Sequence, residues 1–159
     1  MTTVCSIHHG SQESIPLNAS PGLLFLKTFL PLLDSLDDAS SSISTYVSPK
    51  AQFIMNHDPP LSVERLSEMF FTRREMLQLF KHDVSKAWEI SREGGCTVIF
   101  ESVSTTQFKG DDVELEVAEM NVWELEGSKG DKGLKLVEAT CWMDPAVIQS
   151  RARVIFGGK

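Results

Sequence analysis

Apolar and polar positions follow two different periods in the two halves of the chain. Between residues 21 and 80 the apolar side chains recur every three or four positions, whereas from Val84 to Met143 they alternate with polar ones. The first period is typical of helices and the second of strands that bury one face. Helices followed by a long antiparallel sheet predict an α+β fold whose helices cover one face of that sheet.

The N-terminal half predicts a helix and a short strand. Ser20 and Pro21 form a cap and first-turn pair for a helix that ends near Leu36, and Pro31 bends or splits that helix. Residues 51–56 are a candidate strand, which the prolines at positions 59 and 60 terminate.

Helical spacing returns at residues 61–80. Thr72 and Glu75 have the spacing of a capping box, so we expect a break here and a second short helix that begins near Arg73. Beyond it, turn-forming residues separate four predicted antiparallel strands. These strands span residues 84–91, 96–108, 113–126 and 134–143.

The strand at 113–126 has one face that is apolar except for Glu119 and Asn121. Burying an unpaired carboxylate costs several kcal/mol, so Glu119 must be hydrogen-bonded, protonated or open to a cavity. The next strand repeats the pattern, because Leu136 and Trp142 flank Glu138 on one face. We therefore expect a curved sheet with a polar-bottomed cavity on its inner face.

Structural explanations of these carboxylates remain open. Glu119 and Glu138 could pair with a buried Arg73 or Arg74, or a β-bulge could turn them toward solvent. A register in which Gln107 pairs with Val113 would place Glu101 opposite Glu119, and their like charges would raise one pKa. A shift of one residue would remove that coupling.

Composition and charge exclude several classes of function. The 159 residues fit one domain, with residues 1–20 as a mobile polar arm and residues 21–159 as a single α+β domain. A net charge of -7 without basic runs argues against nucleic acid binding. Cys5, Cys96 and Cys141 form neither a disulfide framework nor a zinc motif, and no other spacing predicts a metal site.

No segment of the sequence predicts a membrane span or a secretory signal. The most apolar stretch, residues 23–33, is interrupted by Lys27 and Pro31 and is shorter than the ~20 residues that a span requires. The first residues contain no basic region followed by an apolar one. We expect a soluble cytoplasmic protein.

The order of helices, short strand, capped helix and four long antiparallel strands resembles a known family. It is similar to the cone-shaped, cystatin-like fold of nuclear transport factor 2-like proteins, ketosteroid isomerase, scytalone dehydratase and SnoaL-like polyketide cyclases. The resemblance covers about residues 22–150, and its best local match is LKLVEATCWMDPAVIQSR, residues 134–151. In that fold a curved antiparallel sheet wraps around N-terminal helices.

The resemblance implies cofactor-free acid/base chemistry. The closest class is that of small fungal enzymes that cyclise, isomerise or dehydrate hydrophobic polyketide or terpenoid intermediates of secondary metabolism. The alternative is a non-catalytic ligand-binding or adaptor module of the same fold. Inner-face polar groups favour the enzyme, because an adaptor can have a filled core.

Candidate residues for this chemistry lie mainly on the last two strands. Glu119 has the chemistry of a base, and Asn121 can donate to a developing oxyanion. Trp123 and Trp142 could form flat walls for a substrate, with Glu138 as a further polar contact. Each also has a structural explanation: Asn121 as a hydrogen-bonded amide and the tryptophans as core.

Three further candidates lie near the ends of predicted elements. His82 and Asp83 occupy a rim position, although they could equally end a helix, where the dipole favours His82. Asp144 stands where the family's closing strand has an Asp, which serves as the base in some relatives. Its position before Pro145 also suits a cap of the closing segment.

The opposite face of the 113–126 strand carries an apolar centre with a charged border. Ala118, Met120 and Val122 are flanked by glutamates at both ends of the strand. Such a patch suits a partner related by two-fold symmetry. We therefore expect a homodimer through the outer face of the sheet.

Overall fold

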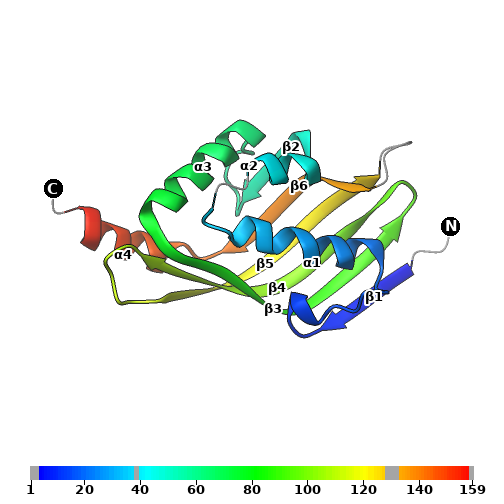
Figure 1. Cartoon of the computed structure of the whole chain (residues 1–159), viewed down its shortest axis with the longest axis horizontal. Coiled ribbons are helices and arrows are strands. Elements are labelled where there is room, and N and C mark those ends of the chain that lie inside the picture. Colours follow the sequence, from blue (N-terminus) through cyan, green and yellow to red (C-terminus); the bar gives the residue numbers. More distant parts are fainter. Residues whose placement is uncertain (1–3, 38–39, 128–132, 158–159) are drawn as a thin grey trace.

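A curved, unclosed mixed sheet forms the frame of the molecule (Figure 1). The computed structural model describes residues 4–37, 40–127 and 133–157. In this part of the chain the strand order is β1-β3-β4-β5-β6-β2, and all neighbours are antiparallel except β2 and β6. The strands are β1 Val4–His9, β2 Val47–Met55, β3 Leu77–Arg92, β4 Gly95–Phe108, β5 Leu115–Gly127 and β6 Leu134–Met143.

The helices cover the inner face and one end of this sheet (Figure 1). They are α1 Pro21–Asp34, α2 Ser40–Tyr46, α3 Val63–Met76 and α4 Ala146–Phe156, with a short 3-10 turn at Gln12–Ser14. α1 lies across the sheet, and α4 packs at its far end. Within the described residues no helix is both long and apolar enough to cross a membrane.

Local sequence and one buried carboxylate determine where α1 begins. Pro21 occupies the first turn, and the backbone N–H groups of Gly22 and Leu23 donate to Oε2 of Glu89 at 2.8 and 3.1 Å. A negative charge at this end is favoured by the helix dipole. Pro31 lies inside the helix and does not split it, so α1 runs unbroken to Asp34.

The core between α1 and the sheet is apolar and rich in aromatic rings. Trp123 is central, with its ring centroid 4.8 Å from that of Phe100 and 5.6 Å from that of Phe29. The fully buried aliphatic and aromatic side chains around it include Ile15, Leu26, Phe29, Leu30, Val98, Phe100, Leu125 and Leu136. A smaller cluster, centred on Leu77, Phe108 and Leu115, lies beneath α4.

The elements of the first half of the chain differ from our expectations in three places. The expected mobile arm contains strand β1, which pairs with β3 along Val4–His9. α3 is one helix without a break, because the Thr72 hydroxyl donates to the carbonyl of Glu68 one turn earlier and does not cap a new helix. β3 then begins at Leu77, so His82 and Asp83 lie in a strand and not at a helix end.

A β-bulge in β6 changes which side chains face inward. Leu125 pairs with Leu136 but Glu124 pairs with Glu138, so β6 has one extra residue, Val137, between these pairs. Beyond the bulge the alternation is reversed. Glu138 and Trp142 therefore lie on the outer face. For Glu138 this is the bulged arrangement that the sequence left open, whereas Trp142 was expected on the inner face and is 41% exposed.

The inner face of β5 is as predicted. Its register with β4 excludes the like-charge interaction between Glu101 and Glu119 that one of the possible registers would have produced. Glu119 and Asn121 are buried together with their apolar neighbours on that face. Ser102 pairs with Glu119, whereas Glu101 pairs with Met120 on the other face. Glu101 and Glu119 therefore do not share a face.

Candidate functional site

A cavity of about 140 Å³ lies between α1, α3 and the inner face of the sheet. Most of its wall is apolar, and its polar lining residues are Arg73, His82, Asn121, Thr140 and Cys141. The apolar wall includes Leu30, Leu33, Phe53, Leu61, Leu66, Phe70, Phe100, Trp123, Leu136 and Ala139. A pocket of this kind can bind an apolar molecule and orient it through a few polar groups.

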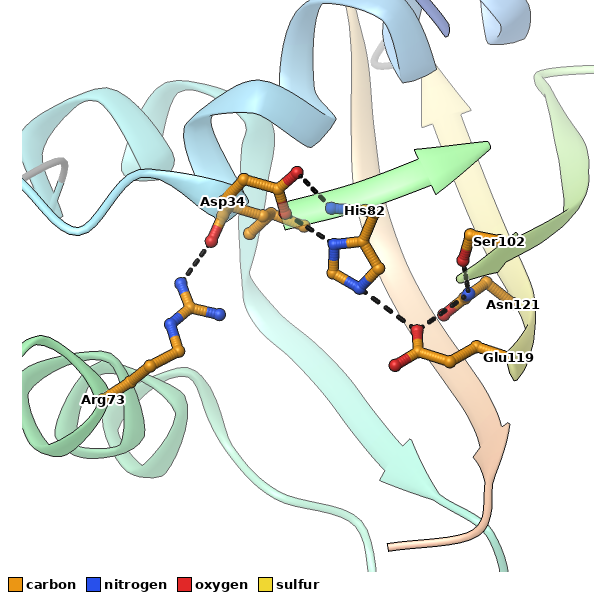
Figure 2. Close-up of polar contacts among 7 residues, drawn as sticks. Asp34, Arg73, His82, Ser102, Glu119 and Asn121 are labelled. Atoms are coloured by element: carbon orange, nitrogen blue, oxygen red, sulfur yellow. Dashed lines mark hydrogen bonds and ion pairs between the residues drawn. The ribbon is translucent and has the colours of Figure 1, made fainter. Parts of the chain in front are cut away.

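His82 lies between two carboxylates from different elements, the half-buried Asp34 and the buried Glu119 (Figure 2). Nδ1 of the ring is 2.5 Å from Oδ1 of Asp34, the last residue of α1, and Nε2 is 3.1 Å from Oε2 of Glu119 in β5. The backbone N–H of His82 also donates to Oδ2 of Asp34 at 2.9 Å. These three bonds fix the imidazole in position and orientation.

The two carboxylates determine the charge of His82. Burial alone lowers the pKa of an imidazole, but hydrogen bonds to Asp34 and Glu119 and their negative charges outweigh burial and raise the pKa of His82 to about 9. Burial alone raises the pKa of Glu119, yet its contacts with His82 bring the net shift below the usual value. At neutral pH the site therefore contains an imidazolium between two carboxylates.

Further polar side chains surround Glu119. Nδ2 of Asn121 lies 3.5 Å from Oε2 of Glu119 and 3.2 Å from Oγ of Ser102 (Figure 2). The Ser104 hydroxyl and the Cys141 thiol also hydrogen-bond to the Glu119 carboxylate. Burial, followed by the charge of Glu119, raises the pKa of Cys141 to about 12, so this thiol stays protonated.

Arg73 of α3 is the second cation of the site. Its Nη2 donates to the carbonyl of Leu33, next to Asp34 (Figure 2), and its guanidinium lies 4.6 Å from the ring centroid of Phe70 and 4.2 Å from that of Phe80. Burial lowers the pKa of Arg73 to about 10, and the charge of Asp34 partly offsets that effect. Arg73 and His82 together balance the two carboxylates.

The structure brings together four of the eight side chains that the sequence singled out. Glu119, Asn121 and His82 form the polar network, and Trp123 and His82 line the cavity wall beside it. The other four lie away from it. Asp83 pairs with Lys81 at 2.8 Å on the outer side, Asp144 is exposed and accepts from the Ala146 N–H at 3.0 Å, and Glu138 and Trp142 are on the outer face.

Sequence reasoning missed Asp34, Arg73 and Cys141 as site residues. Asp34 had a usable signal, because a carboxylate at the C-terminal end of a helix is disfavoured by the dipole and needs a cationic partner. Arg73 was considered only as a partner of the glutamates, and its neighbour in the structure is Asp34. Cys141 faces inward only because of the β6 bulge.

In the described part of the chain, no group of three or more His, Cys, Asp and Glu side chains is placed to hold a metal ion. In sequence comparisons, no protein-family model and no curated protein matches this chain.

Solved structures resemble this one closely in fold. A conserved protein from Planctomyces limnophilus superposes with a TM-score of 0.69 at 9% identity, over 78% of this chain and 94% of the other. The pinacolase BvnE from Penicillium brevicompactum has a TM-score of 0.62 at 12% identity, over 86% and 95%. A SnoaL-like polyketide cyclase candidate from Jannaschia sp. CCS1 has a TM-score of 0.59 at 13% identity, over 85% and 96%.

Other solved structures with the same arrangement are NTF2-like and ketosteroid isomerase-like proteins. Identities this low establish the fold and not an activity. The expected cone-shaped architecture is confirmed: this chain has the fold of nuclear transport factor 2-like, ketosteroid isomerase-like and SnoaL-like polyketide cyclase structures.

Proposed function

We propose that the protein is a cofactor-independent acid/base enzyme that acts on a carbonyl compound whose reacting end is small and largely apolar. The observation that supports this most strongly is the imidazolium of His82, held between Asp34 and Glu119 at the polar end of an otherwise apolar cavity. Paired titratable groups with opposed pKa shifts in a cavity are typical of acid/base sites.

Glu119 does not itself line the cavity but contacts His82, Asn121 and Cys141, which do, and it is the base in this mechanism. Its carboxylate takes a proton from the carbon next to the substrate carbonyl, the C–H electrons form the new C=C bond, and the carbonyl oxygen becomes an enolate. Hydrogen bonds to His82 and Asn121 hold Glu119 in its ionised form. The 3.5 Å contact to Asn121 is the longest of these, so it is the one most readily exchanged for a substrate oxygen.

Asn121 donates to the enolate oxygen, and the Nε2–H of His82 turns to that oxygen once Glu119, its partner in the resting site, has become protonated. An imidazolium N–H and an amide N–H in a water-poor cavity are strong donors to a developing negative charge. Asp34 does not contact the substrate in this scheme; it keeps His82 protonated and oriented. Return of the proton from Glu119 to another carbon gives isomerisation. Loss of a β-hydroxyl as water, with that proton, gives dehydration, and attack of the enolate carbon on a second carbonyl, whose oxygen takes up that proton, gives cyclisation.

The fold comparisons and the cavity support this class of reaction. Solved structures with this fold include a pinacolase and a SnoaL-like cyclase candidate, so the fold accommodates enzymes. A role in secondary metabolism, with a polyketide or terpenoid intermediate as substrate, is the finer part of the proposal.

Proton exchange tests the proposal without knowledge of the natural substrate. Cyclohexanone and cyclohexenone are small enough for the cavity, and exchange of their α-protons in D₂O can be followed by ¹H NMR. We expect exchange above the buffer rate with the wild type, and a loss of at least about 100-fold in Glu119→Gln. Glu116→Gln, the same change on the exposed side of the same strand, is the matched control.

A different result would favour a non-catalytic binding module. That module is the second candidate, because Asp34 and Glu119 already bond both ring nitrogens of His82, an arrangement that also serves structure alone. Exchange at the buffer rate in every ketone, with binding of the same ketones intact, would indicate that the cavity holds a ligand without reacting with it.

A further inference from the structure

A second hollow adjoins the cavity on the side of α2 and α3. It has a volume of about 470 Å³ and lies between the end of α1, α2, the start of β2 and α3. We call it the outer groove. Phe70 and Arg73 line both the outer groove and the cavity, so the two spaces meet at these two side chains.

The outer groove differs from the cavity in polarity. Its wall combines apolar groups such as Leu32, Val63 and Phe71 with hydroxyl groups such as that of Ser67. Among the described residues, its charged side chains are two acids and two bases, Asp37, Glu64, Arg73 and Arg74. Because these formal charges cancel, the groove suits a neutral group with hydrogen-bonding atoms more than an anion or a cation.

The volumes limit what each space can hold. The cavity, at about 140 Å³, is close to the ~150 Å³ of a protein cavity that holds a single benzene ring. A polycyclic molecule cannot fit in it. The cavity and the outer groove together have the volume of a common ligand site of roughly 300–1,000 Å³.

We propose that the outer groove is the second half of one binding site, and that the substrate is a neutral amphipathic molecule of at least two rings. One ring, with the reacting carbonyl, occupies the cavity, and a hydroxyl- or ether-bearing remainder occupies the outer groove. Which end reacts rests on the proposed function, whereas binding across both spaces does not.

Phe70 is the side chain that must move for one molecule to span both spaces. Arg73 is held by its bond to the Leu33 carbonyl and by the rings of Phe70 and Phe80. The half-buried Phe70 ring has no hydrogen-bonding atoms and can change rotamer. Phe70 therefore determines whether the cavity and the outer groove are continuous.

Two neutral phenols of different length test the proposal at equilibrium. Phenol fits the cavity alone, whereas 4-phenylphenol needs both spaces, and both affinities can be measured by calorimetry. Ser67→Trp places an indole in the outer groove. We expect this variant to bind 4-phenylphenol at least about tenfold more weakly than the wild type does, and to change the affinity for phenol by no more than about twofold. Glu75→Trp, on an exposed part of the same helix, should change neither affinity.

Two further measurements make the test sharper. Phe70→Ala removes the shared ring and should raise the affinity for 4-phenylphenol relative to phenol. Biphenyl-4-carboxylate should bind the wild type at least about tenfold more weakly than 4-phenylphenol, because the groove has no net charge to offset the carboxylate. Thermal melts of each variant establish that it is folded.

The proposal is overturned if folded Ser67→Trp binds 4-phenylphenol as tightly as the wild type, or if the carboxylate binds as tightly as the phenol. These affinities do not depend on turnover. Failure of the proposed function would appear as binding across both spaces without α-proton exchange. The present inference fails if α-proton exchange and phenol binding are both observed, but Ser67→Trp leaves the affinity for 4-phenylphenol unchanged.

Discussion

At the scale of single residues, the charge of His82 determines the electrostatics of the site. Its pKa is raised from 6.5 to about 9, so it is protonated over the physiological range. Asp34 is the larger source of that shift among its two partners, and it is held at the end of α1 by bonds to both the ring and the backbone of His82. The imidazolium in turn keeps Glu119 ionised.

Titration of His82 by NMR checks this arrangement. In the wild type the ring signals should titrate near pH 9, and in Asp34→Asn the midpoint should move down toward 6.5, because one carboxylate is lost. Asp83→Asn, on the outer side of the same strand, should leave the midpoint unchanged. A wild-type midpoint near 6.5 would contradict the ion pairs seen here.

The same shift predicts how stability depends on pH. Because the pKa is higher in the folded state, the contribution of His82 is fully present below pH 6.5 and is lost as pH rises through about 9. The loss amounts to roughly 3 kcal/mol for the shift of this well-buried ring. Denaturant unfolding at pH 6 and pH 9.5 measures it, and Asp34→Asn should show a smaller difference between the two pH values.

At the scale of elements, the start of α1 is fixed by its contact with β3 and β4. A Cβ atom on Gly22 would lie 2.7 Å from Sγ of Cys96 and 2.9 Å from Oε2 of Glu89, the carboxylate that accepts from the first turn of the helix. The absence of a side chain at residue 22 therefore allows the helix and the sheet to approach. This approach places Asp34 within reach of His82 at the other end of α1.

Gly22→Ala should destabilise the protein by about 1–3 kcal/mol, because overpacking forces the neighbouring side chains or the helix to shift. Gly133→Ala, where an added Cβ meets no atom of the described residues within 4 Å, should stay within about 0.5 kcal/mol of the wild type. Urea unfolding monitored by circular dichroism measures both. Equal stability of Gly22→Ala and the wild type would mean that α1 can shift freely on the sheet.

At the scale of the whole molecule, the outer face of the sheet offers a surface for a second copy. Ala118 is exposed and Met120 and Val122 are half-buried, as expected from the alternation in β5. The register adds Val103 and Trp142 beside them, at 36% and 41% exposure. This patch is wider than the one that the sequence predicted, because the β6 bulge turns Trp142 outward.

We predict a homodimer through this patch at micromolar concentration. Met120→Glu should convert the dimer to a monomer without loss of secondary structure, since a buried unpaired charge is costly at an interface. Val154→Glu, an equally large change at a position on α4 that is 71% exposed, should leave the dimer intact. Light scattering coupled to size-exclusion chromatography measures the mass of each variant. A monomeric wild type at micromolar concentration would contradict the prediction.

The sequence by itself determined the architecture and half of the candidate site. Period-two alternation identified the strands of the second half, and the two polar residues in an apolar row identified Glu119 and Asn121, because burial of a polar group requires a partner wherever that partner lies. These inferences depend on the chain near each residue. These inferences are therefore correct even though the predicted helix break and some strand ends are not.

Only the tertiary structure determined the partners of those residues. Asp34, His82 and Glu119 are far apart in sequence and meet because α1 crosses the sheet above β3 and β5. The alternating pattern of the sequence does not show where β6 has its bulge. Because of that bulge, Cys141 lies on the inner face, and Glu138 and Trp142 lie on the outer face. Strand register and helix placement depend on the packing of the whole core, and local sequence does not contain that information.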